Sequence, residues 1–240
     1  MIAMGGLQAI LRRGEIRLAV EFKDPDLTGF PPEMYVDKET AKPSGVGPIL
    51  FDIIAADLDV EPMYVDIPWP EHISALQDGD VDVILATNTP QRGLQVGFAG
   101  GRLMANRVVC LTLTSARLSF QQIAKPDVRI ACWRGSSVVD VAKSRFPEAI
   151  VEEYELPEKA VIEGDADVYI NDSITHRFLE LNPELDIVED SVLSREFVHF
   201  AVRLGDADLR LWLNNWYCYH EAQGTIARWC RDWWESFMAI

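Results

Sequence analysis

The sequence predicts an α/β protein made of two similar lobes, each with an open, mostly parallel sheet and helices on its faces. Strand-like and helix-like segments alternate along the chain, a glycine-capped turn occurs twice, and the same order of segments surrounds both turns. The chain has 240 residues, of which 48% are hydrophobic and 25% charged. That length and composition are sufficient for two cores.

The first half alternates apolar runs with helical spacing. A turn-rich loop at 23–32 follows the first strand. The predicted elements are, in order, strand 16–20, helix 46–58, strand 63–67, a short helix at 71–77 and strand 81–86.

A short motif marks the repeat. Gly79-Asp80-Val81-Asp82-Val83 follows a helix and leads into an apolar strand, and the segment 164–168 repeats it as Gly-Asp-Ala-Asp-Val. The second half supplies matching elements around its copy. They are strand 128–132, helix 136–145, strand 150–154 and a short helix from Pro157, followed by helix 174–181, strands 185–188 and 197–202, and helices 208–220 and 225–234.

The last predicted strand suggests how the lobes connect. If strand 197–202 returns to the first lobe, the chain crosses twice, near 101–109 and 199–205, and the two crossings form a hinge. Two Rossmann-like lobes follow, with residues 1–104 and 200–240 in the larger one and 105–199 in the other. Ligands of open α/β sheets bind beyond the carboxyl ends of the strands, so facing lobes predict a cleft lined by the residues after each strand.

Charge excludes some partners. Lys and Arg number 22 against 38 Asp and Glu, a net charge of −16. Such a surface repels nucleic acid and anionic lipid, so neither is expected as a partner. No apolar run approaches the ~20 residues of a membrane helix, and residues 1–13 lack the ordered regions of a signal peptide. A start such as this could replace a removed signal, so it does not assign the protein to the cytoplasm.

Cysteine and histidine give no catalytic or zinc pattern. The four cysteines show no CxxC spacing, so no metal site is expected. Cys218 and Cys230 flank Gly224, which leaves a disulfide and a plain apolar contact both open. The histidines are scattered and are interpreted as surface or packing residues; they are His72, His176, His199 and His220.

The turn after strand 81–86 is the first candidate site. Thr87, Asn88 and Thr89 precede Arg92 in a hydroxyl-rich segment with one cation. An arginine grips a carboxylate through two parallel hydrogen bonds, which are stronger than neutral ones. The alternative is a surface arginine on a capped helix.

The second lobe offers complementary groups. Gly135, Ser136 and Ser137 follow strand 128–132, where backbone and hydroxyl donors at a helix start suit an anion. Asp172 stands at the position equivalent to Thr87 and suits an ammonium group. The alternatives are an ordinary N-cap for the serines and a helix cap at Ser173 for Asp172.

Three further residues fall at the same sheet edge. Phe30 and Trp69 could sandwich a ligand side chain, although packing explains them equally well. Glu21 directly follows the first strand and could meet a distal positive group, or it is a solvated loop acid. A cation with hydroxyls on one lobe and a carboxylate on the other complement a free α-amino acid.

With these residues the chain resembles the extracellular solute-binding proteins of family 3, the polar amino-acid receptors of ABC importers. The resemblance covers nearly the whole chain. The residues that carry it are Phe30-Pro31-Pro32, Gly45, Trp69, Ala75-Leu76-Gln77-Asp78-Gly79-Asp80-Val81-Asp82 and Thr87-Asn88-Thr89-Pro90-Gln91-Arg92.

The resemblance implies a type II periplasmic-binding-protein fold, a periplasmic monomer without cofactor, and delivery of an L-amino acid to the membrane permease of an ABC importer. Two lobes would close around the ligand. In that family the equivalents of Arg92 and Thr87 hold the carboxylate, the Gly135-Ser136-Ser137 turn adds donors, Asp172 takes the ammonium, and Phe30 and Trp69 stack on the ligand. In its basic-amino-acid receptors an acid near Glu21 takes the distal cation, which favours a polar or cationic ligand here.

Departures and alternatives remain. The loop 22–30 is longer than usual, and Gly45-Val46-Gly47 replaces the Gly-Phe-Asp of the family, so the side-chain pocket is reshaped. An enzyme resembling cyclohexadienyl or arogenate dehydratase shares the fold. We expect no enzyme, because no histidine or acid at a strand end is left over for a general acid. The ligand-sensing module of a signalling receptor is the third alternative.

Overall fold

A computed structural model describes residues 6–21, 34–37, 40–172, 174 and 176–230. These residues form two compact units. Unit 2 is Ala105–Glu196, and unit 1 contains the described residues up to Met104 and from Phe197 onward. The chain passes between the units in two strands, β6 (Val96–Leu113) and β11 (Ser194–Arg203).

Three strands of unit 1 end on the same side of its sheet. β1 (Glu15–Val20) pairs in parallel with β4 (Glu61–Asp66), and Leu18 forms a parallel bridge with Val83, just before β5 (Ile84–Thr87). The other neighbour of β5 is β11, which is antiparallel to it. The carboxyl ends of β1, β4 and β5 therefore lie on the same side of unit 1.

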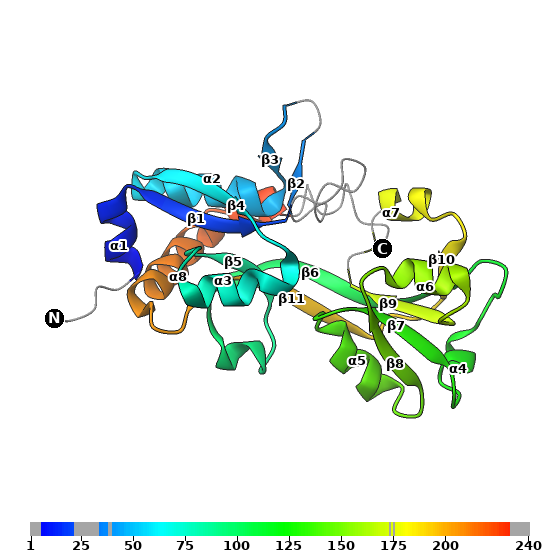
Figure 1. Ribbon diagram of the computed structural model, residues 1–240. Helices are drawn as coiled ribbons and strands as arrows, with labels where there is room; N and C mark the ends of the chain where they lie inside the picture. Colours follow the sequence, from blue (N-terminus) through cyan, green and yellow to red (C-terminus); the bar gives the residue numbers. More distant parts are fainter. Residues whose placement is uncertain (1–5, 22–33, 38–39, 173, 175, 231–240) are drawn as a thin grey trace. The chain divides into compact units, whose positions relative to one another are not determined.

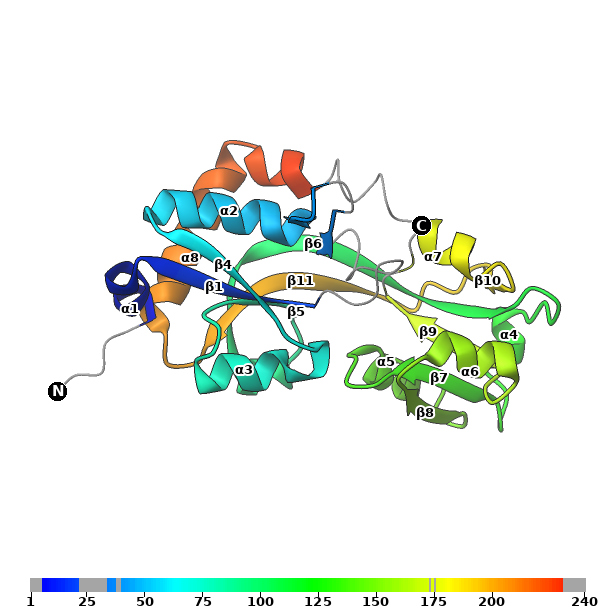
Figure 2. The same cartoon turned by 45° about the horizontal axis from the view of Figure 1, so that its top comes forward.

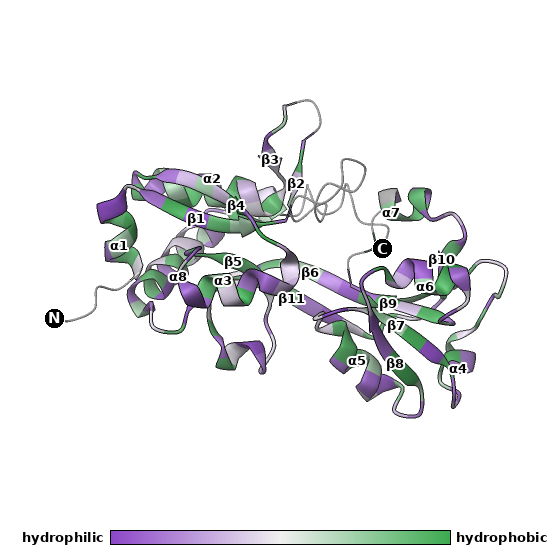
Figure 3. Cartoon of the chain, in the orientation of Figure 1, coloured by the Kyte–Doolittle hydropathy of each residue, from purple (hydrophilic) through white to green (hydrophobic). Residues whose placement is uncertain are grey.

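Helices cover both faces of these strands (Figures 1 and 2). Alternate residues of β1 point to opposite faces. Ile16, Leu18 and Val20 pack with α1 (Gly6–Arg13), α2 (Val46–Leu58) and α8 (Ala207–Ala222), whereas Ala19 packs with α3 (His72–Asp78). The fully buried strand β5 is largely green in the hydropathy view, as expected for a strand covered on both sides (Figure 3).

Short elements complete unit 1. A two-stranded hairpin joins β2 (Tyr35–Val36) to β3 (Pro43–Ser44), and single 3₁₀ turns occur at Trp69–Glu71 and Arg92–Leu94.

Unit 2 is built around β7 (Arg129–Trp133). Its parallel neighbours are β8 (Ile150–Tyr154) and β9 (Val168–Asn171), and β9 pairs antiparallel with β6, which also pairs antiparallel with β10 (Leu185–Ile187). The helices are α4 (Phe120–Ile123), α5 (Val138–Arg145), α6 (Pro157–Glu163) and α7 (His176–Leu181). Ile130 and Cys132 pack with α5, whereas Ala131 packs with α6, so these helices cover opposite faces of β7.

The repeated turn predicted from the sequence is present in both units. Gly79 ends α3 and Gly164 ends α6, both in the left-handed region with φ of 86°. Asp82 then accepts the backbone N–H of Arg17 at 2.9 Å, and Asp167 accepts that of Arg129 at the same distance. The α/β fold class is confirmed, and both units share this local plan.

The structure also corrects the sequence analysis. The sheets are mixed rather than mostly parallel, because β6, β10 and β11 all pair antiparallel. The segment expected as a bare crossing at 101–109 lies within the 18-residue strand β6. Helix α1 and the β2–β3 hairpin were not predicted, and the final helix is described only over 225–230.

All four cysteines are free thiols. Cys218 is exposed and Cys230 is buried, so the pair is not a disulfide. Within the described residues, no helix is long and apolar enough to cross a membrane.

Candidate functional site

Unit 1 brings several of the predicted residues together beyond β1, β4 and β5. Glu21 follows β1, Trp69 follows β4 and Thr87 ends β5. The backbone N–H of Trp69 donates to Oε2 of Glu21 at 2.9 Å, and the guanidinium carbon of Arg92 lies 5.8 Å from the centroid of the Trp69 ring. A carboxylate, an aromatic ring and a cation thus share one edge of the unit.

Glu21 is only 2% exposed. The alternative of a solvated loop acid is therefore wrong. A buried carboxylate is costly unless charge-assisted hydrogen bonds hold it, and the Trp69 N–H supplies one. This hydrogen bond connects the residues that follow β1 and β4.

The Thr87 to Arg92 turn folds back on the end of β5. Nη1 of Arg92 donates to the carbonyl oxygen of Thr87 at 3.3 Å, and the backbone N–H of Arg92 donates to Oγ1 of Thr89 at 3.2 Å. Thr87 is buried, whereas Asn88 is exposed and donates its backbone N–H to Phe197. The half-buried Arg92 guanidinium therefore lies beside Thr87 and Trp69.

His72 packs against the Trp69 ring at this edge, which agrees with its interpretation as a packing residue. It is 2% exposed, its ring lies 5.1 Å from that of Trp69, and its Nε2 lies 3.0 Å from the carbonyl oxygen of Ile67. Burial lowers the pKa of His72 to about 4, so the ring stays neutral near pH 7. A neutral, fixed ring holds one side of the Trp69 indole.

In unit 2, the turn after β7 contains a glycine in a left-handed conformation, which allows a ligand to approach the backbone closely. Gly135 has φ of 71° and donates its N–H to Glu153 Oε2 at 2.9 Å. Ser137 precedes α5, yet its Oγ donates to Glu196 Oε2 at 2.5 Å and does not cap the helix. Ser137 thus stands at the N-cap position of α5 without a side-chain capping bond. Ser136 instead accepts the N–H of Val138 at 3.3 Å.

Asp172 follows β9 and is half-buried. Its Oδ2 accepts a hydrogen bond of 3.1 Å from Nδ2 of the buried Asn106, and its backbone N–H donates to Asn171 at 2.7 Å. The alternative of a cap at position 173 falls on a residue outside the described ones. Asn106 lies on β6, which pairs with β9, and this pairing brings it to Asp172.

Asn106 and Glu196 were missed because neither belongs to a local motif. The strand-end rule points only to residues that follow a predicted strand, and β6 was not predicted. Phe30, with the rest of the segment 22–33, lies outside the described residues. The described residues contain no cluster of His, Cys, Asp or Glu able to hold a metal ion.

Each unit offers a different set of charged and polar groups. Unit 1 presents a guanidinium beside an indole, with a buried carboxylate next to them. Unit 2 presents a carboxylate held by an amide, together with a serine-rich turn on a glycine of positive φ. A guanidinium suits a carboxylate group, and a carboxylate suits an ammonium group.

The family described as bacterial extracellular solute-binding proteins, family 3, matches residues 27–236. None of the curated proteins compared with the chain matches it.

Many solved structures match. The ancestral amino acid-binding protein AncCDT-1, a precursor of cyclohexadienyl dehydratase, is 26% identical with a TM-score of 0.77, covering 96% of this chain and 99% of that one. A mutant of ArgBP from T. maritima is 25% identical with a TM-score of 0.78 and the same coverage, 96% and 99%. An ancestral cyclohexadienyl dehydratase, at 24% identity and a TM-score of 0.55 over 97% and 98% of the chains, shows similarity of fold alone.

Proposed function

Because this chain belongs to the bacterial extracellular solute-binding proteins of family 3, we propose that it is a receptor for a free amino acid. The chain has the type II periplasmic-binding-protein fold of its structural neighbours. The family is extracellular, and we place this member in the periplasm, as a monomer that delivers its ligand to the permease of an ABC importer.

The position of Arg92 is the observation that carries the proposal. Its guanidinium lies at the end of β5, 3.3 Å from the Thr87 carbonyl oxygen and over the Trp69 ring. An α-carboxylate in that place would accept charge-assisted hydrogen bonds from Arg92 and the Thr87 hydroxyl, with Asn88 and Thr89 beside them. Trp69, together with Phe30, would supply flat apolar contact to the ligand.

We assign the ammonium group of the ligand to Asp172. The Asn106 amide holds one carboxylate oxygen of Asp172 at 3.1 Å and orients the group. The Gly135, Ser136 and Ser137 turn would add donors to the ligand carboxylate. One ligand that engages residues of both units would stabilise them in a single arrangement, which is how binding would be signalled to a permease.

The buried carboxylate of Glu21 favours a ligand with a cationic side chain. Its carboxylate is buried beside Trp69, where a basic group would supply the opposite charge. The similarity to AncCDT-1, named an amino acid-binding protein, and to ArgBP of T. maritima agrees with an amino-acid ligand, and the second agrees with a basic one.

Titration calorimetry with the twenty amino acids tests the proposal, on protein unfolded and refolded to remove copurified ligand. We expect one or a few L-amino acids to bind at micromolar concentration, roughly −8 kcal/mol. Arg92→Ala should weaken binding by about 3 kcal/mol, because the ligand carboxylate loses its charged partner. Arg12→Ala, which removes an exposed arginine of α1, is the matched control and should bind as wild type.

Two further variants test the finer assignments. Asp172→Asn should weaken the binding of the same ligand that Arg92→Ala affects. Glu21→Gln should lower the affinity for arginine relative to that for glutamine. Unchanged relative affinities in Glu21→Gln would remove the cationic preference but leave amino-acid binding intact. Wild-type affinity in Arg92→Ala would contradict the whole assignment.

A dehydratase is the second candidate, because AncCDT-1 is described as a precursor of cyclohexadienyl dehydratase. Such a reaction needs a general acid near the leaving hydroxyl. At the unit 1 edge, His72 is buried against Trp69 and its Nε2 lies 3.0 Å from the carbonyl oxygen of Ile67, while His199 lies on β11 opposite Ala86 of β5. Binding and turnover of prephenate, with no response to amino acids, would favour the enzyme.

A further inference from the structure

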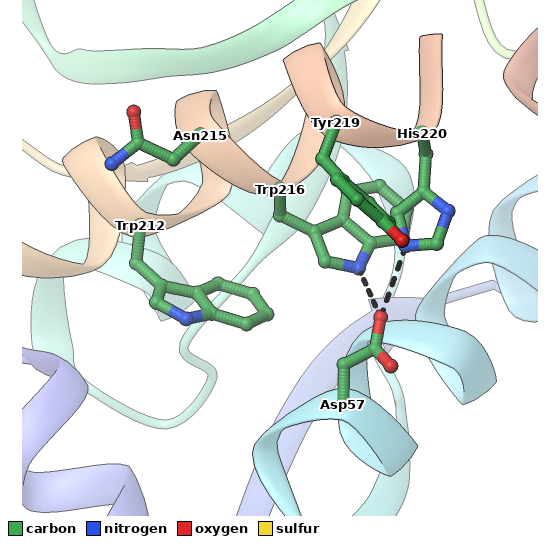
Figure 4. Close-up of a pocket in the computed structure, with 6 residues that line it drawn as sticks. All are labelled: Asp57, Trp212, Asn215, Trp216, Tyr219 and His220. Carbon is green, nitrogen blue, oxygen red and sulfur yellow. Dashed lines mark hydrogen bonds and ion pairs between the residues drawn. The ribbon is translucent and has the colours of Figure 1, made fainter. Parts of the chain in front are cut away.

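A pocket lies within unit 1, between α2 and α8, and shares no residue with the strand-end site. Asp57 stands in the last turn of α2, shortly before the amino end of β4. The residues proposed to bind the amino acid follow the carboxyl ends of the strands instead. The pocket has a volume of about 490 Å³, within the range of small-molecule sites. Its lining residues are Asp57, Trp212, Asn215, Trp216, Tyr219 and His220 (Figure 4).

Helical spacing on α8 builds most of the lining. Trp212, Trp216 and His220 follow one another at intervals of four residues, so their side chains form one row on the helix. Tyr219 stands beside this row, with its ring 5.1 Å from the His220 ring. The Trp216 and His220 rings are 4.6 Å apart. One side of the pocket is therefore aromatic, and the His220 ring contacts those of both Trp216 and Tyr219.

The opposite side carries a fixed negative charge. Oδ2 of Asp57 accepts hydrogen bonds from Nε1 of Trp216 at 2.7 Å and from Nε2 of His220 at 3.1 Å, as the dashed lines of Figure 4 show. Oδ1 of Asp57 accepts no hydrogen bond from any residue in the described part of the chain, and the side chain is 45% exposed. The carboxylate is held in place while one oxygen stays open to a ligand.

Aromatic faces around a carboxylate have a specific chemical complement. Ring faces are electronegative and attract cations, most strongly those that are weakly hydrated. The carboxylate adds direct charge, and the net charge of −16 draws cations to the protein. We infer that this pocket is a second ligand site, which binds a small organic cation of the quaternary ammonium class. The charge lies near Oδ1 of Asp57, and the methyl groups contact Trp212 and Tyr219.

Tetramethylammonium is the probe, because it has the required charge and shape and no carboxylate for Arg92. Binding is measured by NMR titration of the ¹⁵N-labelled indole N–H signals at constant ionic strength. We expect saturable shifts of the Trp216 signal, whose N–H contacts Asp57. Asp57→Asn, which keeps an acceptor oxygen but no charge, should weaken binding by about fivefold or more.

Asp59→Asn is the matched control. Asp59 is an exposed acid two residues further on, with φ of 56°, a conformation that asparagine adopts readily. This variant removes the same charge and should bind tetramethylammonium as wild type does. The comparison of the two variants separates a specific contact from general attraction to an acidic protein.

The neutral isostere 3,3-dimethylbutan-1-ol separates charge from shape when compared with choline. Choline should bind and the alcohol should not. Equal binding of the alcohol, equal binding by Asp57→Asn, or no saturable shift would each overturn the inference. Arg92→Ala should leave tetramethylammonium binding unchanged, so this inference and the amino-acid proposal can fail separately.

Discussion

The two units contain the same five-residue turn in different surroundings. In each, the second aspartate of the turn accepts the backbone N–H of an arginine in a neighbouring parallel strand, Arg17 for Asp82 and Arg129 for Asp167. Asp82 has a side chain only 2% exposed and also binds Arg13 at the end of α1, whereas the Asp167 side chain is 35% exposed. A repeated sequence thus fixes the hydrogen-bond pattern, while its burial depends on what the rest of the chain places over it.

The largest expected difference lies between these two aspartates. Asp82→Ala should lower the free energy of unfolding by about 4 kcal/mol, because two arginines and a backbone N–H lose their buried acceptor. Urea unfolding followed by circular dichroism measures the loss. A loss no greater than that of Asp167→Ala would show that the deeper burial of Asp82 has no energetic role.

The second prediction concerns acid, and it applies to unit 1. Burial lowers the pKa of His72 to about 4, from an ordinary value of 6.5. As the pH falls below 6.5, the unfolded state binds a proton that the folded state does not. Stability should therefore fall between pH 6.5 and 4, by about 3 kcal/mol in total.

His72→Gln provides the control for that titration. The variant is expected to be less stable at pH 7, but its free energy of unfolding should change less between pH 6.5 and 4 than that of wild type. His176→Gln, at an exposed histidine of unit 2, should keep the wild-type slope. Equal slopes in wild type and His72→Gln would contradict the prediction.

A smaller effect is expected at the exposed copy of the ion pair. Asp167→Ala should cost about 1 kcal/mol, because water partly screens Arg129 and Asp167. The Arg129 guanidinium lowers the pKa of Asp167. A lowered acid pKa stabilises the fold above the ordinary value near 4, and that contribution disappears as the pH falls further. The stability gap between wild type and variant should therefore narrow from pH 5 to pH 2, measured by urea unfolding.

The smallest difference is expected at the paired glycines. Gly79→Ala and Gly164→Ala should each cost about 1 kcal/mol, because both positions have positive φ. A new Cβ at Gly79 would also lie 3.2 Å from Nη1 of Arg203, whereas nothing lies within 4 Å of one at Gly164. Gly79→Ala should therefore be slightly the more destabilising in thermal unfolding, and the reverse order would show that Arg203 moves aside freely.

The sequence predicts features that depend on neighbours along the chain. The repeat, the helix Val46–Leu58 and the strand Ile150–Tyr154 all follow from periodicity and turn residues within short segments. The strand β6 could not be recognised in this way. Its burial does not alternate regularly, and it contains Gly100 and Gly101, against which Tyr217 of α8 packs. Its extended structure depends on distant partners.

The candidate site divides along the same line. The strand-end rule selected Glu21, Trp69, Thr87 and Arg92, and the structure places them at one edge because their strands are parallel. The contacts that orient the residues of unit 2 could not be predicted. Ser137 is paired with Glu196, 59 residues away, and Asp172 with Asn106, 66 residues away. Such pairs follow from strand pairing, and local spacing contains no sign of them.

The division of unit 1 into two separate stretches of chain also determines when each unit can fold during synthesis. The strand β5 obtains its partner β11 through Val198↔Thr87, and the core of unit 1 includes Leu213 and Trp216 of α8. The described residues of unit 2 form one continuous stretch that ends before α8 begins. As the chain is made or exported from its N-terminus, therefore, the second unit has all of its residues while the first still lacks β11 and α8. The unit that is made first is therefore the last to complete its core.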